Sequence, residues 1–120
     1  MQHYYSEKNM EMRPAGAAYS PAMGNWVTGD RIIFGKIRIP AGTGSKPHRH
    51  SNEQFIIVLE GSVRMNIEGD AKTLSAGDII HIPPNALHWA EVVGNEEFVF
   101  VTAKDTSWGI EGIAEEAELN

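Results

Sequence analysis

Histidine is the residue type in this sequence best suited to chemistry, since the chain has five histidines and no cysteine. Disulfides, thiolate metal sites and thiol nucleophiles are therefore excluded. His48 and His50 form a His-x-His pair, and Gln54 follows four residues later. In an extended strand, side chains two or four residues apart share a face, so these three side chains should project together. The same parity sends Glu53 to the opposite face, so a metal ion at this site would take the amide of Gln54 as a ligand.

The segments around these residues consist of short, mostly alternating or β-branched apolar stretches separated by glycine, proline and asparagine. Such spacing without helical periodicity predicts an antiparallel sandwich or barrel, and the fold class is therefore all-β. We expect the histidine pair to stand at the entrance of a strand that continues through Gln54. The expected strands cover residues 31–39, 54–59, 62–67, 71–74, 79–82, 88–93 and 97–102.

The chain length of 120 residues suits a single domain. We expect an irregular N-terminal arm over residues 1–25, a barrel over 26–105 and a C-terminal segment over 106–120. The formal net charge of -6 would be -2 without the four glutamates of the last ten residues, so the acidity mainly describes a short C-terminal tail.

Charge and hydropathy limit the classes of partner. The acidic balance argues against nucleic acid, because duplex binding requires a basic face. The longest apolar run, residues 55–59, is far below the roughly 20 residues that a membrane helix needs. The first residues lack a basic stretch followed by an apolar one, so no secretory signal is predicted. These features suit a cytoplasmic protein, although a processed secreted chain would share them.

Two glycine-framed motifs about 40 residues apart resemble the two signature motifs of the cupin superfamily. The first consists of Gly42, His48, His50, Gln54 and Gly61, with five, one, three and six residues between successive members. The second consists of Gly77, Pro83, Asn85 and His88, with five, one and two residues between them. The resemblance covers roughly residues 31–102. It implies a jelly-roll β-barrel of two antiparallel sheets and a homodimer.

The resemblance also implies a metal site. Its ligands would be His48, His50, Gln54 and His88, and its ion a divalent transition metal: zinc, nickel, iron, manganese, cobalt or copper. The sequence has Gln54 where the family usually has glutamate, as in the small cupins that read His-x-His-x-x-Glu-Gln. It also has Asn85 where the family usually has glycine, a mild change because asparagine tolerates a left-handed backbone.

Four neutral ligands would leave the ion its full charge and open positions for water or substrate oxygens. Such an ion suits a Lewis-acid enzyme of isomerase, lyase or cyclase type, acting on a small oxygen-rich metabolite such as a sugar acid or keto compound. A metal-dependent dioxygenase and a non-catalytic small-molecule-binding or sensor barrel are the alternatives. Related uronate ring-openers place a carboxylate on the strand after the second motif, whereas residues 98–102 contain none.

Other residues have weaker roles. His81 is expected to be a barrel or interface histidine rather than a pocket acid or base, and His3 to be exposed in the arm. Arg64 could clamp an anionic substrate, but a solvated strand face is the preferred interpretation, and Lys36 and Arg38 should face outward. Trp108 is expected to cap the barrel or contact a partner subunit. Five side chains could line a pocket, although ordinary barrel core is the preferred interpretation of each: Trp26, Ile56, Val58, Met65 and Phe100.

Overall fold

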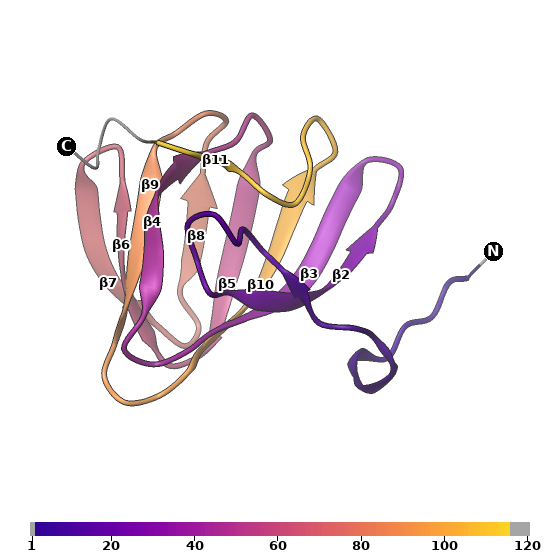
Figure 1. The fold of residues 1–120 in the computed structure, drawn as a ribbon, viewed down its shortest axis with the longest axis horizontal. Coiled ribbons are helices and arrows are strands. Elements are labelled where there is room, and N and C mark those ends of the chain that lie inside the picture. Colours follow the sequence, from indigo (N-terminus) through magenta and orange to yellow (C-terminus); the bar gives the residue numbers. More distant parts are fainter. Residues whose placement is uncertain (1, 116–120) are drawn as a thin grey trace.

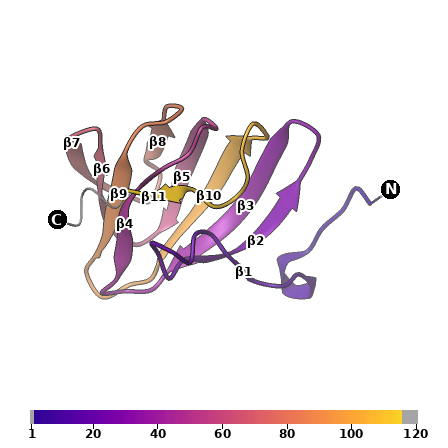
Figure 2. The same ribbon diagram turned by 45° about the horizontal axis from the view of Figure 1, so that its top comes forward.

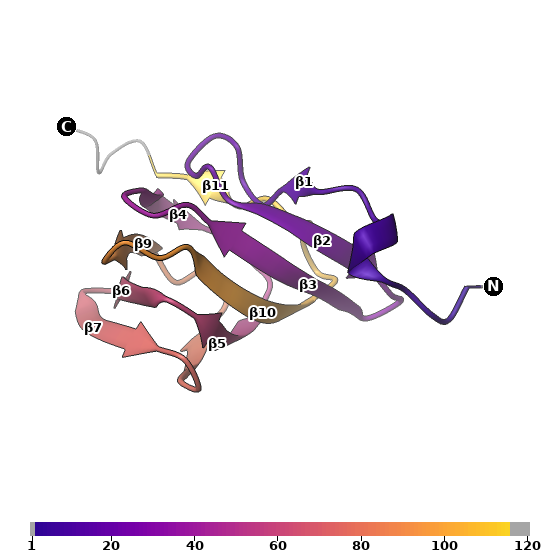
Figure 3. The ribbon, with the colours of Figure 1, turned by 90° about the horizontal axis from the view of Figure 1, so that it is seen from below.

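The computed structural model describes residues 2–115 and shows two antiparallel sheets packed face to face as a jelly roll (Figures 1 and 3). The all-β prediction is confirmed. The six-stranded sheet has the order β1 (Arg13–Pro14), β2 (Met23–Thr28), β3 (Ile32–Ile39), β10 (Phe98–Asp105), β5 (Gln54–Glu60) and β8 (Ile79–Ile82). The five-stranded sheet has the order β11 (Ile113–Ala114), β4 (Gly44–Arg49), β9 (His88–Val93), β6 (Ser62–Ile67) and β7 (Asp70–Ser75).

The core lies between the two sheets, and side-chain alternation along the strands determines which residues enter it. In β3, the side chains of Ile33, Ile37 and Ile39 are buried. Those of Ile32 and Phe34, on either side of Ile33, are exposed. In β5, Gln54, Ile56 and Val58 point inward in the same way. A strand with one face on a core shows this period of two because successive side chains point to opposite faces.

The histidine pair and Gln54 do not share a strand, contrary to our prediction. His48 belongs to β4 in the five-stranded sheet, whereas Gln54 begins β5 in the six-stranded sheet. His50 lies between the two strands, where the chain crosses from one sheet to the other. Strand β4 was missed because Pro47 and two glycines obscure its period, and β4 is irregular, with a register shift between Ser45 and His48.

Turn geometry explains the departure at the second motif. Asn85 has a φ of 62°, in the left-handed region, and its N–H donates to the carbonyl of His50 at 2.8 Å. The tolerance of asparagine for this conformation therefore substitutes for the usual glycine, as predicted. Gly61 of the first motif also has a positive φ of 76°, and a Cβ there would lie 2.5 Å from the Glu97 carbonyl oxygen.

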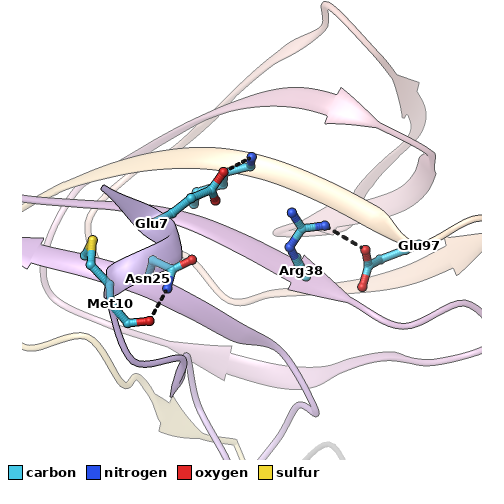
Figure 4. A network of polar contacts seen from close by, with 6 residues as sticks. Glu7, Met10, Asn25, Arg38 and Glu97 are labelled. Carbon is cyan, nitrogen blue, oxygen red and sulfur yellow. Dashed lines mark hydrogen bonds and ion pairs between the residues drawn. The ribbon is translucent and has the colours of Figure 1, made fainter. Parts of the chain in front are cut away.

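The N-terminal arm runs along the six-stranded sheet and then over one end of the barrel. Its 3-10 turn η1 (Glu7–Asn9) is held by an ion pair of 3.1 Å between Glu7 and Lys36 and by Asn25, whose side-chain amide donates to the carbonyl of Met10 at 3.5 Å (Figure 4). Farther along, the carbonyl of Tyr19 accepts a hydrogen bond of 2.8 Å from the N–H of Lys46, which places the arm beside β4 (Figure 2). The arm is thus part of the barrel wall.

The remaining predictions about the ends of the chain fall partly outside the described residues. Residues 116–120 include Glu116 and Glu118 of the acidic tail and are not described. Before them, β11 pairs with β4, with Ala114 opposite His48. The helix described within residues 2–115 is the single turn η1, so that part of the chain has no helix with the length and hydropathy needed to cross a bilayer.

Candidate metal centre

The four predicted ligands come together between the two sheets, from strands β4, β5 and β9 and from the link between β4 and β5. His48 on β4 and His88 on β9 are direct cross-strand partners, and their ring centres lie 4.1 Å apart. The ring of His50 lies 5.0 Å from that of His88 and 6.3 Å from that of His48. Gln54 approaches from the opposite sheet, and its Oε1 lies 3.0 Å from Nε2 of His50. All four side chains are buried.

Each of the three imidazoles is oriented by a backbone carbonyl two residues away. Nδ1 of His48 lies 2.7 Å from the Lys46 oxygen, that of His50 2.9 Å from the Asn52 oxygen, and that of His88 2.9 Å from the Ala86 oxygen. A carbonyl oxygen only accepts hydrogen bonds, so each Nδ1 carries the hydrogen. In the neutral ring Nε2 then keeps its lone pair, which is the tautomer of a metal-ligating histidine supported by an outer hydrogen bond.

The amide of Gln54 is also fixed in one orientation. The hydroxyl of Thr102 donates to the carbonyl of Phe55 at 2.9 Å, so its oxygen is left to accept. Nε2 of Gln54 donates to that oxygen at 2.9 Å. The amide oxygen of Gln54 is therefore the atom that faces His50.

These two assignments place two acceptors against each other. Nε2 of His50 and Oε1 of Gln54 are 3.0 Å apart, and neither carries a hydrogen in the neutral state. A cation shared by the two atoms would resolve this contact, because both would then direct a lone pair at positive charge. The donor set therefore fits a divalent metal ion.

The histidines are kept neutral by their surroundings. Burial lowers the pKa of His48 to about 4 and that of His88 to about 3, and it also lowers the pKa of His50. The ammonium of Lys104 acts in the same direction on all three, since it disfavours another positive charge nearby. At neutral pH the lone pairs on Nε2 are consequently available without loss of a proton.

The rings of His48, His50 and His88 do not converge on a single point in this structure. Within residues 2–115, no three histidine or carboxylate groups stand close enough together to hold one ion. The rings of His48 and His88 are the closest pair, the His50 ring lies farther from each of them, and the His48 ring also stacks on Tyr19 at 3.8 Å between ring centres. Coordination by all three imidazoles therefore requires them to move closer together than they stand here.

A cavity of about 70 Å³ adjoins the four side chains. Since one water needs roughly 10–15 Å³ on this scale, the cavity accommodates several waters or one small organic molecule. Of the five candidate lining residues, Val58 is ordinary core away from the cavity, as the preferred interpretation had it. The others do line it: Trp26, Ile56, Met65 and Phe100.

Our reading of the sequence missed two titratable residues of the cavity. Tyr19 is buried in the arm, its hydroxyl accepts a 2.7 Å hydrogen bond from the N–H of Gly112, and burial raises its pKa. No period in residues 1–25 indicated this position. Lys104 lies two positions beyond Thr102 in β10, which extends to Asp105 rather than ending at residue 102. Counting by two from Phe100 would have found it.

The other candidates lie outside the cavity. Glu53 does face away from Gln54, and its carboxylate lies 2.6 Å from Nε2 of His81 on the exposed face of the sheet. His81 also stacks on Phe55, with ring centres 4.6 Å apart. This position fits the expectation that His81 is not an acid or base of the pocket. Arg64 is exposed and donates to the hydroxyl of Thr73 at 3.4 Å, as expected of a solvated strand face.

The remaining cations and aromatic residues pair locally. Lys36 and Arg38 are on the outer face, where Arg38 pairs with Glu97 at 2.9 Å (Figure 4). Trp108 is exposed, and its indole N–H donates to the carbonyl of Glu111 at 2.9 Å. His3 is exposed in the arm.

Similarity to known proteins is clearest in the barrel. The dimethylsulfoniopropionate lyase DddW of Ruegeria pomeroyi is 33% identical over 69 residues, which are 58% of this chain and 45% of that protein. This chain spans less than half the length of the curated relatives that it matches.

Solved structures extend the likeness in fold to most of the chain. An RmlC-like cupin from Shewanella frigidimarina superposes with a TM-score of 0.75 at 22% identity, covering 88% of this chain and 91% of the other. The polyketide cyclase RemF from Streptomyces resistomycificus gives a TM-score of 0.75 at 18% identity, covering 88% and 80%. The family model of the cupin domain matches residues 35–104. This stretch contains both histidine motifs and the strands that carry them, and the chain belongs to the cupin family.

Proposed function

We propose that this chain is a metal-dependent enzyme whose divalent transition metal ion is held by His48, His50, Gln54 and His88. The observation that carries the proposal is the contact of 3.0 Å between Nε2 of His50 and Oε1 of Gln54, two acceptors in the neutral state whose lone pairs a shared metal ion would accommodate. The matching tautomers of His48 and His88 supply two further lone pairs on the same cavity.

A metal ion in this donor set would act as a Lewis acid toward a bound carbonyl or carboxylate oxygen. The chain contributes the surroundings. Aliphatic and aromatic side chains form most of the cavity wall, and they limit the water that reaches the reacting group. Tyr19 covers His48 from the arm side, and Thr102 holds the Gln54 amide so that its oxygen faces inward.

The reaction class that this arrangement favours is lyase, isomerase or cyclase chemistry on a small oxygen-rich molecule. Each of these reactions builds negative charge on a substrate oxygen, and a cation with no carboxylate ligand stabilises such charge strongly. The similarity to DddW, described as a lyase, supports this class. The resemblance in fold to RemF, described as a cyclase, is compatible with it.

Metal analysis of purified protein, reconstituted with zinc, cobalt or manganese and then dialysed, tests the site. We expect stoichiometric metal in the wild type and its loss in His48→Ala and His88→Ala. His81→Ala is the matched control, because His81 lies on the outer face and should leave the metal in place. Stoichiometric metal surviving in both cavity variants would overturn the proposed function.

We also propose that the chain forms a homodimer through the outer face of its six-stranded sheet. Large apolar side chains gather there, including Phe34, Phe55, Ile57 and Ile79, with Ile79 67% exposed and Phe34 53% exposed. Strand register places Ile57 directly between Val101 and Ile79. Monomers seldom expose a contiguous apolar patch of this kind, and a second copy of the same face would cover it.

A further inference from the structure

Lys104 is a buried ammonium group whose charge the described part of the chain does not neutralise. Its side chain is 6% exposed and lines the same cavity as the histidines. Nζ donates one hydrogen bond, of 2.7 Å, to the carbonyl of Ile110. Within residues 2–115, no carboxylate lies within ion-pairing distance of it. An ammonium group has three hydrogens to donate, so this one retains donors beyond its single protein acceptor.

The neighbouring carboxylate does not serve as its partner. Asp105 follows Lys104 in β10, but strand alternation turns its side chain outward, where it accepts the N–H groups of Glu53 and Ser107 at 2.8 Å each. Among the described residues that line the cavity, Lys104 is the one with a full charge at neutral pH. The cavity is therefore electropositive before any metal ion enters it.

Such a charge is unfavourable for the unliganded fold. Burial lowers the pKa of Lys104 to about 8, and the contact of Nζ with the face of Trp26, 5.7 Å from the ring centre, offsets only part of the lost hydration. Trp26 adds a second donor in the cavity wall, because its buried Nε1 has no hydrogen-bond partner among the described residues. An ammonium group with hydrogens to spare and an indole N–H without a described partner, in one small apolar cavity, indicate an acceptor that comes from outside the chain.

We propose that Lys104 makes this cavity selective for a small monocarboxylate, whose carboxylate group is held by the ammonium of Lys104 beside the histidines. The ammonium of Lys104 can pair with one carboxylate group, and the apolar wall suits a ligand with a short carbon body. This inference rests on the proposed function for the identity of the site as a substrate pocket. It adds the class of substrate and the residue that selects it.

Binding of two probes of nearly equal shape tests the proposal: propionate, which is charged, and propionamide, which is neutral. Both are titrated into 15N-labelled protein stripped of metal, at pH 7, and binding is followed through amide chemical shifts. We expect propionate to bind at least about tenfold more tightly, since ion pairs to a desolvated charge are the strong ones. Lys104→Met and Lys104→Gln should both remove that preference.

Lys72→Met is the matched control, because Lys72 is exposed on β7 and should leave the preference unchanged. Equal binding of the two probes by the wild type would overturn the proposal, as would a preference that survives in both Lys104 variants. Because these titrations use metal-free protein, they are independent of the metal site. A chain that prefers propionate but never binds metal would contradict the proposed function and leave the role of Lys104 intact.

Discussion

Thr102 fixes the side-chain amide of Gln54 through a hydrogen bond of 2.9 Å that crosses from β10 to β5. The hydroxyl of Thr102 uses its single hydrogen on the carbonyl of Phe55, so it can only accept from Gln54. A threonine that touches no predicted ligand atom thereby determines which atom of Gln54 faces His50. Its role is to position the ligand.

Replacing Thr102 by valine keeps the shape of the side chain and removes the acceptor. We expect Thr102→Val to weaken metal binding by about tenfold or more, since outer partners of ligands commonly have effects of this size. Competition with a chromophoric chelator measures the change. Thr102→Ser should stay close to the wild type, because it retains the hydroxyl. Equal losses in both variants would attribute the effect to packing instead.

Gln54 and Glu53 are adjacent residues that face opposite sides of the sheet, and they make a direct comparison possible. Gln54→Ala should weaken metal binding, but less than His88→Ala, because an amide oxygen is a poorer ligand than an imidazole. Glu53→Ala should leave metal binding unchanged, since its carboxylate contacts His81 on the outer face. Metal titrations of the three variants would contradict this arrangement if Glu53→Ala lost the ion and Gln54→Ala kept it.

Acid should destabilise the metal-free protein through its neutral histidines. The ordinary histidine pKa of 6.5 applies to the unfolded chain, whereas the folded pKa values are about 4 for His48 and about 3 for His88. Below pH 6.5 the unfolded chain therefore binds protons that the folded chain does not. The free energy of unfolding is therefore highest above pH 6.5 and decreases as the pH falls toward 3. For each histidine the decrease is on the order of 1 kcal/mol per pH unit.

Chemical denaturation in the presence of a chelator, from pH 7.5 to 4.5, measures this dependence. His88→Gln removes one of the three histidines whose pKa is lowered, so its stability should fall less steeply over the same range. The same slope in both proteins would show that His88 is not the source of the pH dependence.

Lys104→Met should stabilise the metal-free protein while it removes the preference for a carboxylate. The substitution exchanges a buried unpaired charge for an apolar side chain of similar length, which is expected to raise the free energy of unfolding by about 1 to 3 kcal/mol. Lys72→Met, at an exposed position of β7, should change it by less than about 0.5 kcal/mol. Urea denaturation at pH 7 compares them, and a destabilised Lys104→Met would contradict the account of Lys104 as an unfavourable buried charge.

Two charges on the outer apolar face should separate the proposed homodimer. Ile57→Asp combined with Ile79→Asp places like charges on cross-strand neighbours of the β5–β8 pair, where each copy would face the other. Light scattering after gel filtration should then give the mass of one chain instead of two. Ala71→Asp, on the exposed face of β7, is the control and should remain dimeric. A monomeric wild type would contradict the dimer directly.

Local patterns in the sequence were enough to predict the all-β fold, because strand alternation and turn residues are properties of a few adjacent residues. Most strand bounds follow from them, as in 62–67, 79–82 and 88–93, which the structure reproduces. The positive φ of Asn85 was predictable for the same reason, since it depends on what one residue tolerates.

Strand alternation predicted that the side chains of His48, His50 and Gln54 project together, but the single continuous strand assumed for that prediction was wrong. The three side chains converge because β4 and β5 belong to opposite sheets that face each other, and not because they continue one strand. A sequence pattern describes neighbours along the chain and carries no information about which sheet a strand joins.

The sequence by itself determined the donor types, nitrogen and oxygen without sulfur, and the spacing of the two motifs. Only the tertiary structure decided which further groups share their cavity. Tyr19 comes from the arm and Lys104 from the end of β10, each more than 15 residues from the nearest of the four ligands. Their burial beside the histidines depends on the packing of two sheets, and with it the shifted pKa values, because desolvation is set by every neighbour in space.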